Sequence, residues 1–493
     1  MKAEIIINKN FVIDRIDKRI YGSFLEHVGR AVYGGIYEPT HSSANKDGFR
    51  EDVLELVRKL NVPVIRYPGG NFVSGYNWED GTGDKSKRPK RQDLAWRTIE
   101  TNQVGIDEFQ KWTKQADSGI IMAVNVGTRG PVDAKNLVEY CNGETDTYYA
   151  NMRRENGFEK PFNIKTWCIG NEMDGAWQIG HKTADEYGRI AEETGKLMKL
   201  VDPDIELVAC GSSDYNISTF GQWEYTVLDH AYDVVDYISL HQYYKKSDTK
   251  DFLGNTVHMD SFIKSVAAIC DAVKAKKHSS KTINLSFDEW NVWHSNGCPM
   301  FDWEIAPHLY ENVYSFEDAL LVGSMLITLQ NNCDRVKIAC LAQLVNVIAP
   351  IMTEDNGDAW VQTTFYPFMY SSAFGRGTTL KTVTKCETYN TSDGAVVPYI
   401  DVSVINNEET RELIAFIVNR SLDCDIETSF SLGEFENAVL KEHIVLYSDN
   451  LKSTNTKEKA EVVPENLAVN KVKGEKQTVT LKKHSWNMLR FDY

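Results

Sequence analysis

Two glutamates stand where mostly apolar runs of the sequence end: Glu172 in WCIGNEMDG (167–175) and Glu289 in SFDEWNVW (286–293). A run that only filled a core would close on glycine or proline, yet the first of these runs ends on an amide beside a carboxylate, Asn171 and Glu172. Paired carboxyl groups without metal ligands around them indicate cleavage of a glycosidic bond. One protonated carboxyl donates to the leaving oxygen, while an ionised one meets the anomeric carbon. Glu172 and Glu289 are the candidates for these two roles.

Other polar side chains lie at the ends of further apolar runs and suit the binding of a sugar. Asn171 is placed to hydrogen-bond the hydroxyl next to the anomeric carbon, an interaction that strengthens in the transition state. Tyr243 is a candidate for orienting the ionised carboxylate, and Arg66 for a buried ion pair that positions one. The candidates for gripping the remaining hydroxyls are Glu26, Asn71 and Gln343. Four tryptophans offer faces to sugar C–H surfaces, although each taken singly is better explained as core: Trp177, Trp290, Trp293 and Trp303.

Two neighbours of these candidates have competing explanations. His241, in SLHQYY (239–244), is either a satisfied core histidine or a group that contacts the sugar or supports a catalytic side chain. Its place in this motif favours the second. Asp288 directly precedes Glu289, and successive side chains of a regular strand point to opposite faces. We therefore expect Asp288 to be structural and to face away from the site.

Eight near-continuous apolar runs alternate with amphipathic segments between residue 19 and about residue 345. Such runs are typical of parallel strands that are buried on both faces. In the helical segment 183–204, Thr183 and Glu186 form a capping box and Pro203 stops the helix. This order favours a (β/α)8 TIM barrel over an open doubly wound sheet, and no GxGxxG fingerprint follows the first run. The runs are Arg19–Phe24, Val62–Tyr67, Ile120–Gly127, Ile164–Gly170, Ile205–Gly211, Val235–His241, Ile283–Asp288 and Val336–Leu344.

Active sites of such barrels form at the carboxyl ends of the strands, so the candidates above converge on one face. After about residue 375 the helical pattern stops. Short strand-like pieces separated by polar turns then predict an all-β sandwich. The opening AEIIINKNFVID (3–14) also reads as a strand and is expected to join that sandwich. The predicted domains are residues 1–15 with the sandwich, 16–370 as the catalytic barrel and 371–493 as the sandwich itself.

The composition argues against several kinds of partner. The 493 residues carry a formal net charge of −16, whereas nucleic acids and anionic membranes attract basic surfaces. The one basic cluster, residues 85–91, is interpreted as a solvated loop, with a subunit contact or the rim of a site as the alternative. We find no secretory signal and no run of about 18 apolar residues, and the nine cysteines lack CxxC or zinc-site spacing. We therefore expect reduced thiols and a cytoplasmic location.

Six ordered motifs resemble the α-L-arabinofuranosidases of glycoside hydrolase family 51: FLEHVGR, IRYPGGNFVSGYNWEDG, WCIGNEMDG, SLHQYY, SFDEWNVW and LAQLVNVIAP. The resemblance covers most of the chain. It implies that Glu172 is the general acid/base and Glu289 the nucleophile. It also implies a jelly-roll sandwich, a retaining mechanism and a homohexamer without metal or cofactor. The sugar-contacting positions that it implies are Glu26, Asn71, His241, Tyr243 and Gln343.

We therefore expect a retaining, exo-acting α-L-arabinofuranosidase that removes terminal arabinofuranosyl residues from arabinan or arabinoxylan oligosaccharides. The two carboxyl groups should then lie about 5–5.5 Å apart. Another glycosidase on the same scaffold, such as a β-xylosidase or an endo-β-glucanase, is the nearest alternative. A non-catalytic carbohydrate-binding barrel and a metal-dependent barrel enzyme are the others. An exo-enzyme needs a closed pocket, and the long aromatic loop around Trp293–Trp303 favours one.

Overall fold

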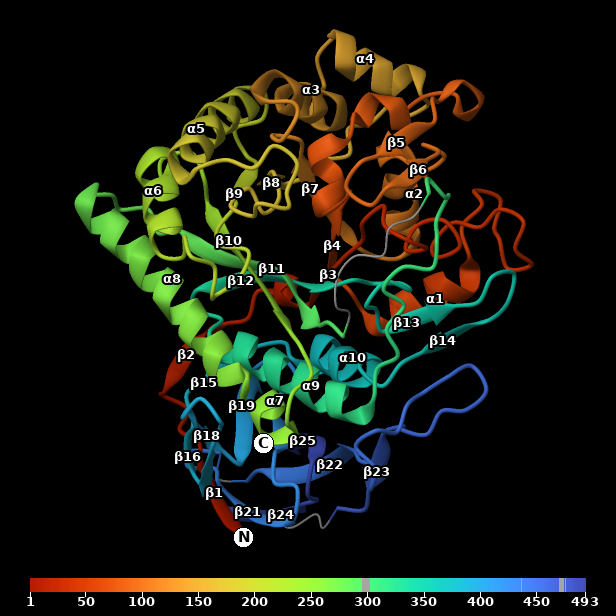
Figure 1. Cartoon of the computed structure of the whole chain (residues 1–493). Coiled ribbons are helices and arrows are strands. Elements are labelled where there is room, and N and C mark those ends of the chain that lie inside the picture. Colours follow the sequence, from red (N-terminus) through yellow and green to blue (C-terminus); the bar gives the residue numbers. More distant parts are fainter. Residues whose placement is uncertain (295–301, 436, 470–473, 475) are drawn as a thin grey trace.

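Eight parallel strands close into a barrel in this computed structural model, which describes residues 1–294, 302–435, 437–469, 474 and 476–493 (Figure 1). Neighbouring strands follow the chain order, and the barrel closes where β12 pairs with β3. Each of the eight predicted apolar runs supplies one strand, which confirms the predicted (β/α)8 barrel. The strands are β3 (Gly22–Phe24), β4 (Val64–Tyr67), β7 (Gly119–Val124), β8 (Thr166–Ile169), β9 (Glu206–Ala209), β10 (Tyr237–Tyr244), β11 (Asn284–Val292) and β12 (Val336–Ala342).

Helices surround the barrel (Figure 1). The predicted capping box is present at the start of α5, where Thr183 and Glu186 each accept a hydrogen bond from the other's backbone N–H. Among the described residues, no helix combines the length and the apolar character needed to cross a membrane. The helices are α1 (Glu51–Leu60), α2 (Ile106–Gln115), α3 (Pro131–Asn142), α4 (Tyr148–Glu155), α5 (Ala184–Val201), α6 (Gln222–Ala231), α7 (Thr249–Gly254), α8 (Thr256–Lys276), α9 (Phe316–Asn331) and α10 (Phe365–Phe374).

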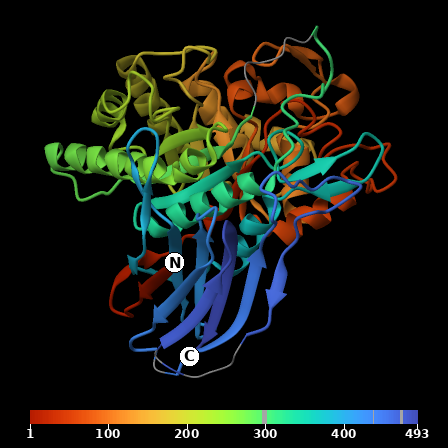
Figure 2. The same cartoon turned by 60° about the horizontal axis from the view of Figure 1, so that its bottom comes forward.

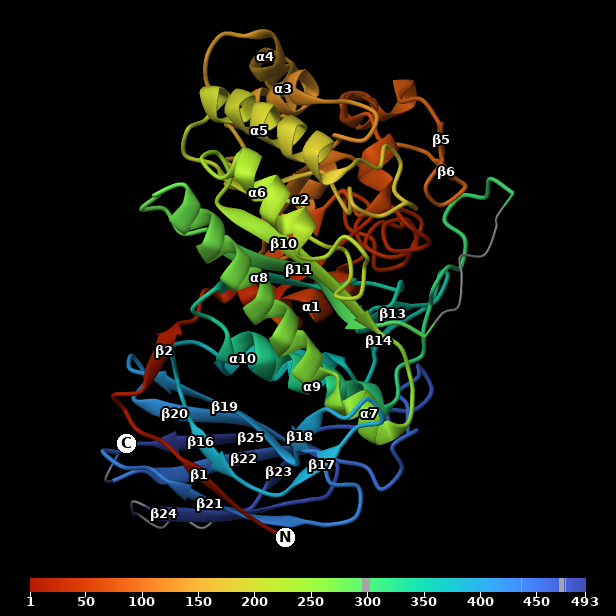
Figure 3. The same ribbon diagram turned by 60° about the vertical axis from the view of Figure 1, so that its left-hand side comes forward.

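Two sheets form the C-terminal sandwich, and both chain termini lie on it (Figure 3). One sheet has the order β16-β1-β21-β24 and the other the order β2-β15-β19-β20-β25-β22-β23. The predicted all-β sandwich is thereby confirmed. Its strands are β1 (Lys2–Ile6), β2 (Val12–Arg15), β15 (Thr378–Leu380), β16 (Val383–Lys385), β19 (Ile400–Asn407), β20 (Glu412–Asn419), β21 (Ile426–Ser431), β22 (Val439–Leu446), β23 (Glu465–Leu467), β24 (Lys476–Leu481) and β25 (Ser485–Asp492).

The barrel and the sandwich meet through α9 and α10, which lie between them (Figures 2 and 3). Trp486 of β25 is fully buried against α9. A Cβ at Gly323 would lie only 2.4 Å from the Trp486 ring, so glycine permits this close approach. Trp486 belongs to the same apolar core as the helices around the barrel. A second core fills the space between the two sheets, with Ile5, Phe430 and Leu489 among its members.

Short hairpins outside the barrel shape the loops at its carboxyl end. They are β5–β6 (Arg91–Asp93 and Thr98–Glu100) and β13–β14 (Ile351–Thr353 and Ala359–Val361). A third, β17–β18 (Thr388–Asn390 and Val396–Pro398), belongs to the C-terminal part. The interpretation of residues 85–91 as a solvated loop is wrong for Arg88. Its side chain is 2% exposed and pairs with Glu108 at 2.9 Å, because that carboxylate offsets the cost of burying the charge.

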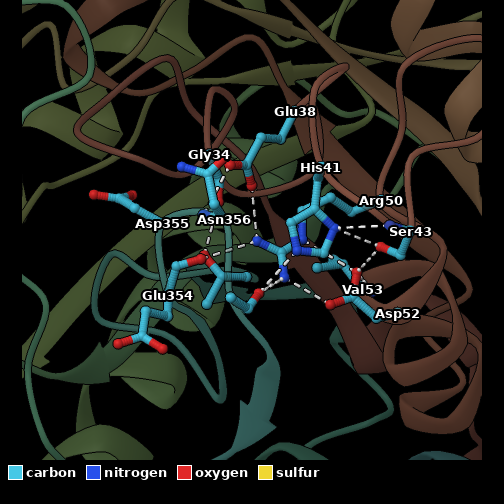
Figure 4. Close-up of polar contacts among 12 residues, drawn as sticks. Gly34, Glu38, His41, Ser43, Arg50, Asp52, Val53, Glu354, Asp355 and Asn356 are labelled. Atoms are coloured by element: carbon cyan, nitrogen blue, oxygen red, sulfur yellow. Dashed lines mark hydrogen bonds and ion pairs between the residues drawn. The ribbon is translucent and has the colours of Figure 1, made fainter.

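Arg50 joins the long loop after β3 to the β13–β14 hairpin (Figure 4). Its guanidinium is fully buried and pairs with Glu38 at 2.8 Å and with Asp52 at 2.6 Å. It also donates to the backbone carbonyl oxygens of Glu354 and Gly357 at the turn of the hairpin. The loop that begins with Glu26 and the segment that follows β12 are thus fixed to each other away from the barrel axis.

Candidate active site

A cavity of about 440 Å³ opens at the carboxyl ends of the barrel strands. Six of the eight predicted site residues line it: Glu26, Asn71, Glu172, Tyr243, Glu289 and Gln343. The other two, Asn171 and His241, are buried beneath this lining, at 1% and 2% exposure. The structure therefore brings together residues that more than 300 positions of the chain separate, as strand-end placement requires.

Glu172 projects from the turn that follows β8. The turn is tight, with positive φ at Gly170 (91°) and at Glu172 itself (42°). One carboxylate oxygen, Oε1, lies 2.9 Å from Nδ1 of His241, and the other, Oε2, accepts a hydrogen bond of 2.6 Å from the indole of Trp177. The carboxylate is therefore held between His241 of β10 and Trp177 of its own loop.

Glu289 lies on β11 and is 5% exposed. Its Oε1 accepts a hydrogen bond of 2.8 Å from Arg66, and its Oε2 accepts one of 2.8 Å from the hydroxyl of Tyr243. Burial raises the pKa of Glu289, and the neighbouring Glu172 raises it further. His241, Arg66 and Tyr243 oppose that change and favour the ionised form. The predicted roles of Arg66 and Tyr243 as partners of a carboxylate agree with these contacts.

Arg66 also positions the amide of Asn171. Its second terminal nitrogen donates to Oδ1 of Asn171 at 2.8 Å, which leaves Nδ2 as the donor group of this amide. Nδ2 of Asn171 makes long hydrogen bonds to Oε1 of Gln178 at 3.4 Å and to Oδ1 of Asn71, a residue of the cavity lining, at 3.5 Å. A single buried guanidinium therefore orients both the carboxylate of Glu289 and the amide beside Glu172.

Glu26 lines the same cavity as Glu172 and Glu289. Its Oε1 accepts hydrogen bonds from the backbone of Phe72 at 2.9 Å and from the indole of Trp96 at 3.0 Å. Gln343 accepts a hydrogen bond from the backbone N–H of Glu26 at 3.0 Å. Burial raises the pKa of Glu26 to about 8. A Cβ at Gly70 would lie 2.6 Å from the Glu26 carboxylate, so any other residue at this position would displace that carboxylate.

The expectation that Asp288 faces away from the site is wrong. Its Oδ1 lies 2.9 Å from Nε2 of His241, and Oδ2 lies 3.7 Å from Nε of Arg66. The physical reason is an irregular strand: the pairing of β11 with β12 changes register between Phe287 and Trp290. Such a bulge breaks the alternation of faces, so that two successive carboxylates reach the same network.

The aromatic residues divide into lining and core. Trp177 and Trp293 line the cavity, whereas Trp290 is fully buried in the core and Trp303 is not among the lining residues. Trp96 and Tyr310 also line it, and the sequence reasoning missed them. The signal for Trp96 is its place in a long insertion after β4, on the face where barrel loops gather. Residues 295–301 of the predicted aromatic loop lie outside the described residues.

Among the described residues, one group of three side chains converges closely enough for a metal ion: Glu172, His241 and Glu289, with candidate ligand atoms within 4.8 Å of one another. The nitrogens of His241 face Glu172 and Asp288. Burial opposes charge on this ring, yet the surrounding carboxylates raise the pKa of His241 to about 10. A ring protonated on both nitrogens has no lone pair for a cation. The donor set therefore fits a proton-sharing network.

A (β/α)8 barrel with paired glutamates at the carboxyl ends of its strands belongs to the class of barrel glycoside hydrolases. Residues 56–262 match the model described as the α-L-arabinofuranosidase 1 domain, and residues 288–485 match that of the α-L-arabinofuranosidase C-terminal domain. The chain is 55% identical, over 99% of both chains, to an intracellular exo-α-(1→5)-L-arabinofuranosidase of Halalkalibacterium halodurans. The chain belongs to the α-L-arabinofuranosidases of glycoside hydrolase family 51.

Solved structures agree with this assignment over the whole chain. A family 51 α-L-arabinofuranosidase from Bifidobacterium longum superposes with a TM-score of 0.96 at 44% identity, covering 99% of both chains. The arabinose complex of an α-L-arabinofuranosidase from Thermotoga maritima gives a TM-score of 0.89 at 33% identity, again over 99% of both chains. The family predicted from the six sequence motifs is confirmed.

Proposed function

We propose that this protein is a retaining, exo-acting α-L-arabinofuranosidase that removes terminal non-reducing arabinofuranosyl residues from arabinan or arabinoxylan oligosaccharides. The observation that carries the proposal is the pairing of Glu172 and Glu289, whose nearest carboxylate oxygens lie within 4.8 Å of each other. Retaining enzymes hold their carboxyl groups about 5–5.5 Å apart, whereas inverting enzymes leave about 6.5–9.5 Å for a water molecule. The spacing supports direct attack by one carboxylate on the sugar.

In the first step, Glu289 attacks the anomeric carbon while Glu172 donates its proton to the leaving glycosidic oxygen, so the glycosidic bond breaks as a bond to Glu289 forms. Arg66 and Tyr243 hold Glu289 ionised and aimed through one hydrogen bond to each oxygen. In the second step, Glu172 takes a proton from water, and the resulting hydroxide releases the arabinose from Glu289. Two inversions leave the configuration retained.

The remaining predicted contacts serve to bind the sugar. Asn171, fixed by Arg66, is placed for the hydroxyl beside the anomeric carbon. Glu26, Asn71 and Gln343 line the far side of the cavity, where the other hydroxyls of the ring would lie. The proposed role of His241 is to support Glu172 from beneath, since it does not line the cavity. No role is left for a cofactor in this scheme.

The names of the relatives support the finer points. Relatives at 55–56% identity are called intracellular exo-α-(1→5)-L-arabinofuranosidases, and we extend their location and linkage to this chain. A homohexamer follows from the family resemblance alone, and light scattering during size-exclusion chromatography tests it. The acidic balance of the chain supports the view that nucleic acid and membrane are not partners.

The deciding experiment is hydrolysis of an aryl α-L-arabinofuranoside by the wild type, by Glu289→Ala and by Glu172→Ala. We expect rapid release by the wild type, a loss of more than ~10⁴-fold in Glu289→Ala, and a loss of about 10²–10⁴-fold in Glu172→Ala. Proton NMR of the first product should show the retained anomer. A wild type that cleaves only the aryl xyloside or glucoside would move the assignment to another glycosidase.

A further inference from the structure

The carboxylate of Asp288 has no direct part in the two steps above, yet it is buried at 1% exposure. Its hydrogen bond of 2.9 Å reaches Nε2 of His241. The thiol of Cys168 lies 3.5 Å from Oδ2, and Arg66 approaches only to 3.7 Å, beyond hydrogen-bond distance. A buried carboxylate is costly without partners, and Asp288 has two charged or chargeable ones, the ion pair with Arg66 and the shorter hydrogen bond to His241. Of these two, His241 is the partner that also contacts Glu172.

His241 connects this carboxylate to the proposed acid/base. Nδ1 of the ring lies 2.9 Å from Oε1 of Glu172 and 3.7 Å from Oε2 of Glu289. Nε2 is occupied by Asp288 on the opposite edge. Asp288 accepts the proton on Nε2, and the carboxylates of Glu289 and Asp288 beside the ring favour a second proton on Nδ1, which then faces Glu172. Asp288, His241 and Glu172 thus form a series of hydrogen bonds that runs from the barrel interior to the cavity.

This hydrogen-bond series distinguishes the two carboxylate oxygens of Glu172. Oε1 faces Nδ1 of His241, whose ring is positively charged when both nitrogens carry protons, whereas Oε2 accepts from the neutral indole of Trp177, which is half-exposed at the cavity rim. The positive charge opposes a proton on Oε1 more strongly than the neutral indole opposes one on Oε2. The transferable proton is therefore favoured on Oε2. After the transfer, the new carboxylate lies against a positively charged ring.

We propose that Asp288 is a positioning residue that acts through His241 to direct the transferable proton of Glu172 to Oε2 and to hold the opposing charge beside Glu172 once the proton has left. The inference rests on the proposed function, because it assigns a device to the acid/base of that reaction. The proton balance is unchanged: Oε2 gives its proton to the leaving oxygen in the first step and regains one from water in the second. His241 and Asp288 exchange no net proton.

Several charged and titratable groups surround the Asp288–His241–Glu172 series and set the pH at which it titrates. They come from β4, from the turn after β8, and from β10 and β11: Arg66, Glu172, Asp174, Tyr243 and Glu289. A merely structural Asp288, needed only to offset the charge of Arg66, would support the nucleophile Glu289 as much as the acid/base. The two roles differ in how the reaction depends on the leaving group.

The test compares Asp288→Asn with the wild type on two substrates, using kcat/KM because it reports the first step. An α-(1→5)-linked arabinobiose needs a proton on its leaving oxygen, whereas a 2,4-dinitrophenyl arabinofuranoside does not. We expect kcat/KM for the disaccharide to fall about 10- to 100-fold and that for the aryl substrate less than about 3-fold. Asp107→Asn is the matched control and should change neither, because the buried carboxylate of Asp107 in α2 accepts its hydrogen bond from Tyr140 in α3.

Equal losses on both substrates would overturn the proposal while leaving the proposed function intact. Failure of the wild type to cleave either substrate would instead refute the proposed function. A histidine ¹⁵N NMR spectrum of the wild type adds a test that does not require the variant to fold. One of the eleven imidazole rings should keep protons on both nitrogens at about pH 8. Eleven neutral rings at that pH would also overturn the proposal.

Discussion

Arg66→Met removes the guanidinium that contacts the proposed nucleophile, Glu289, in the described part of the chain. Arg66 is 1% exposed and lies 2.8 Å from Oε1 of Glu289. Two unit charges at that distance interact by about 6 kcal/mol in an effective dielectric of ~20, which is an upper bound. The net contribution of a hydrogen bond to a charged group is smaller, about 1.5–3 kcal/mol. At ~1.36 kcal/mol for each pH unit, the smaller figure corresponds to about one to two pH units.

The sign of the effect follows from the charge. Arg66 favours the ionised form of Glu289, so its removal raises the pKa of that carboxyl. The attack requires an ionised Glu289. In the variant, the same ionised fraction of Glu289 as in the wild type would be reached only at a higher pH. We expect the acid limb of kcat/KM for an aryl arabinofuranoside to move upward by about one to two pH units in Arg66→Met.

The assay is a profile of kcat/KM against pH, with circular dichroism to show that each variant is folded. Arg66→Lys is the matched variant, because it keeps a positive charge near Glu289 but loses the second donor that holds Asn171. Its acid limb should move less than that of Arg66→Met. A folded Arg66→Met whose rate falls evenly at all pH values, with the limb in place, would refute the electrostatic reasoning.

Three further outcomes are expected. Gly70→Ala places a methyl group against the Glu26 carboxylate. We expect KM to rise at least about 10-fold with little change in the melting midpoint. An unchanged KM would contradict the close approach. Trp177→Ala removes an aromatic face from the cavity rim, so KM for oligosaccharides should rise about 2- to 12-fold; an equal KM for the two proteins would argue against that contact. Arg50→Met leaves Glu38 and Asp52 without their buried partner. Calorimetry should show that the free energy of unfolding falls by about 3 kcal/mol. An unshifted thermal transition would count against the ion-pair argument.

The barrel could be predicted because its strands are buried on both faces, which forces near-continuous apolar runs such as Val62–Tyr67 around β4. The carboxyl-end rule then placed polar residues from distant strands on one face, and the structure indeed gathers Glu26, Glu172 and Glu289 around one cavity. Both inferences depend on the local pattern and on chain order. They do not require knowledge of side-chain packing.

Other features depend on information that no local pattern contains. The side of β11 on which Asp288 lies is decided by a register shift against β12, a property of the paired strands. Trp96 reaches the cavity through a hairpin with strands of only three residues, too short for a periodic signal. Arg88 appeared within a run of basic residues, and its burial follows from Glu108, a partner twenty positions away.

The strand order of the sandwich has a consequence for synthesis of the chain. β1 is made before the barrel, yet its parallel partner β21 leaves the ribosome roughly 420 residues later. At about 5–20 residues per second, the first strand must wait roughly 20–80 s while the whole barrel is translated. Its other neighbour in the sheet, β16, is made only shortly before β21, so the apolar residues of β1, among them Ile5 at 0% exposure in the finished protein, lack a sheet partner for most of that interval. The opening segment is therefore where a chaperone would be needed first, and where an added tag would interfere with the final sheet.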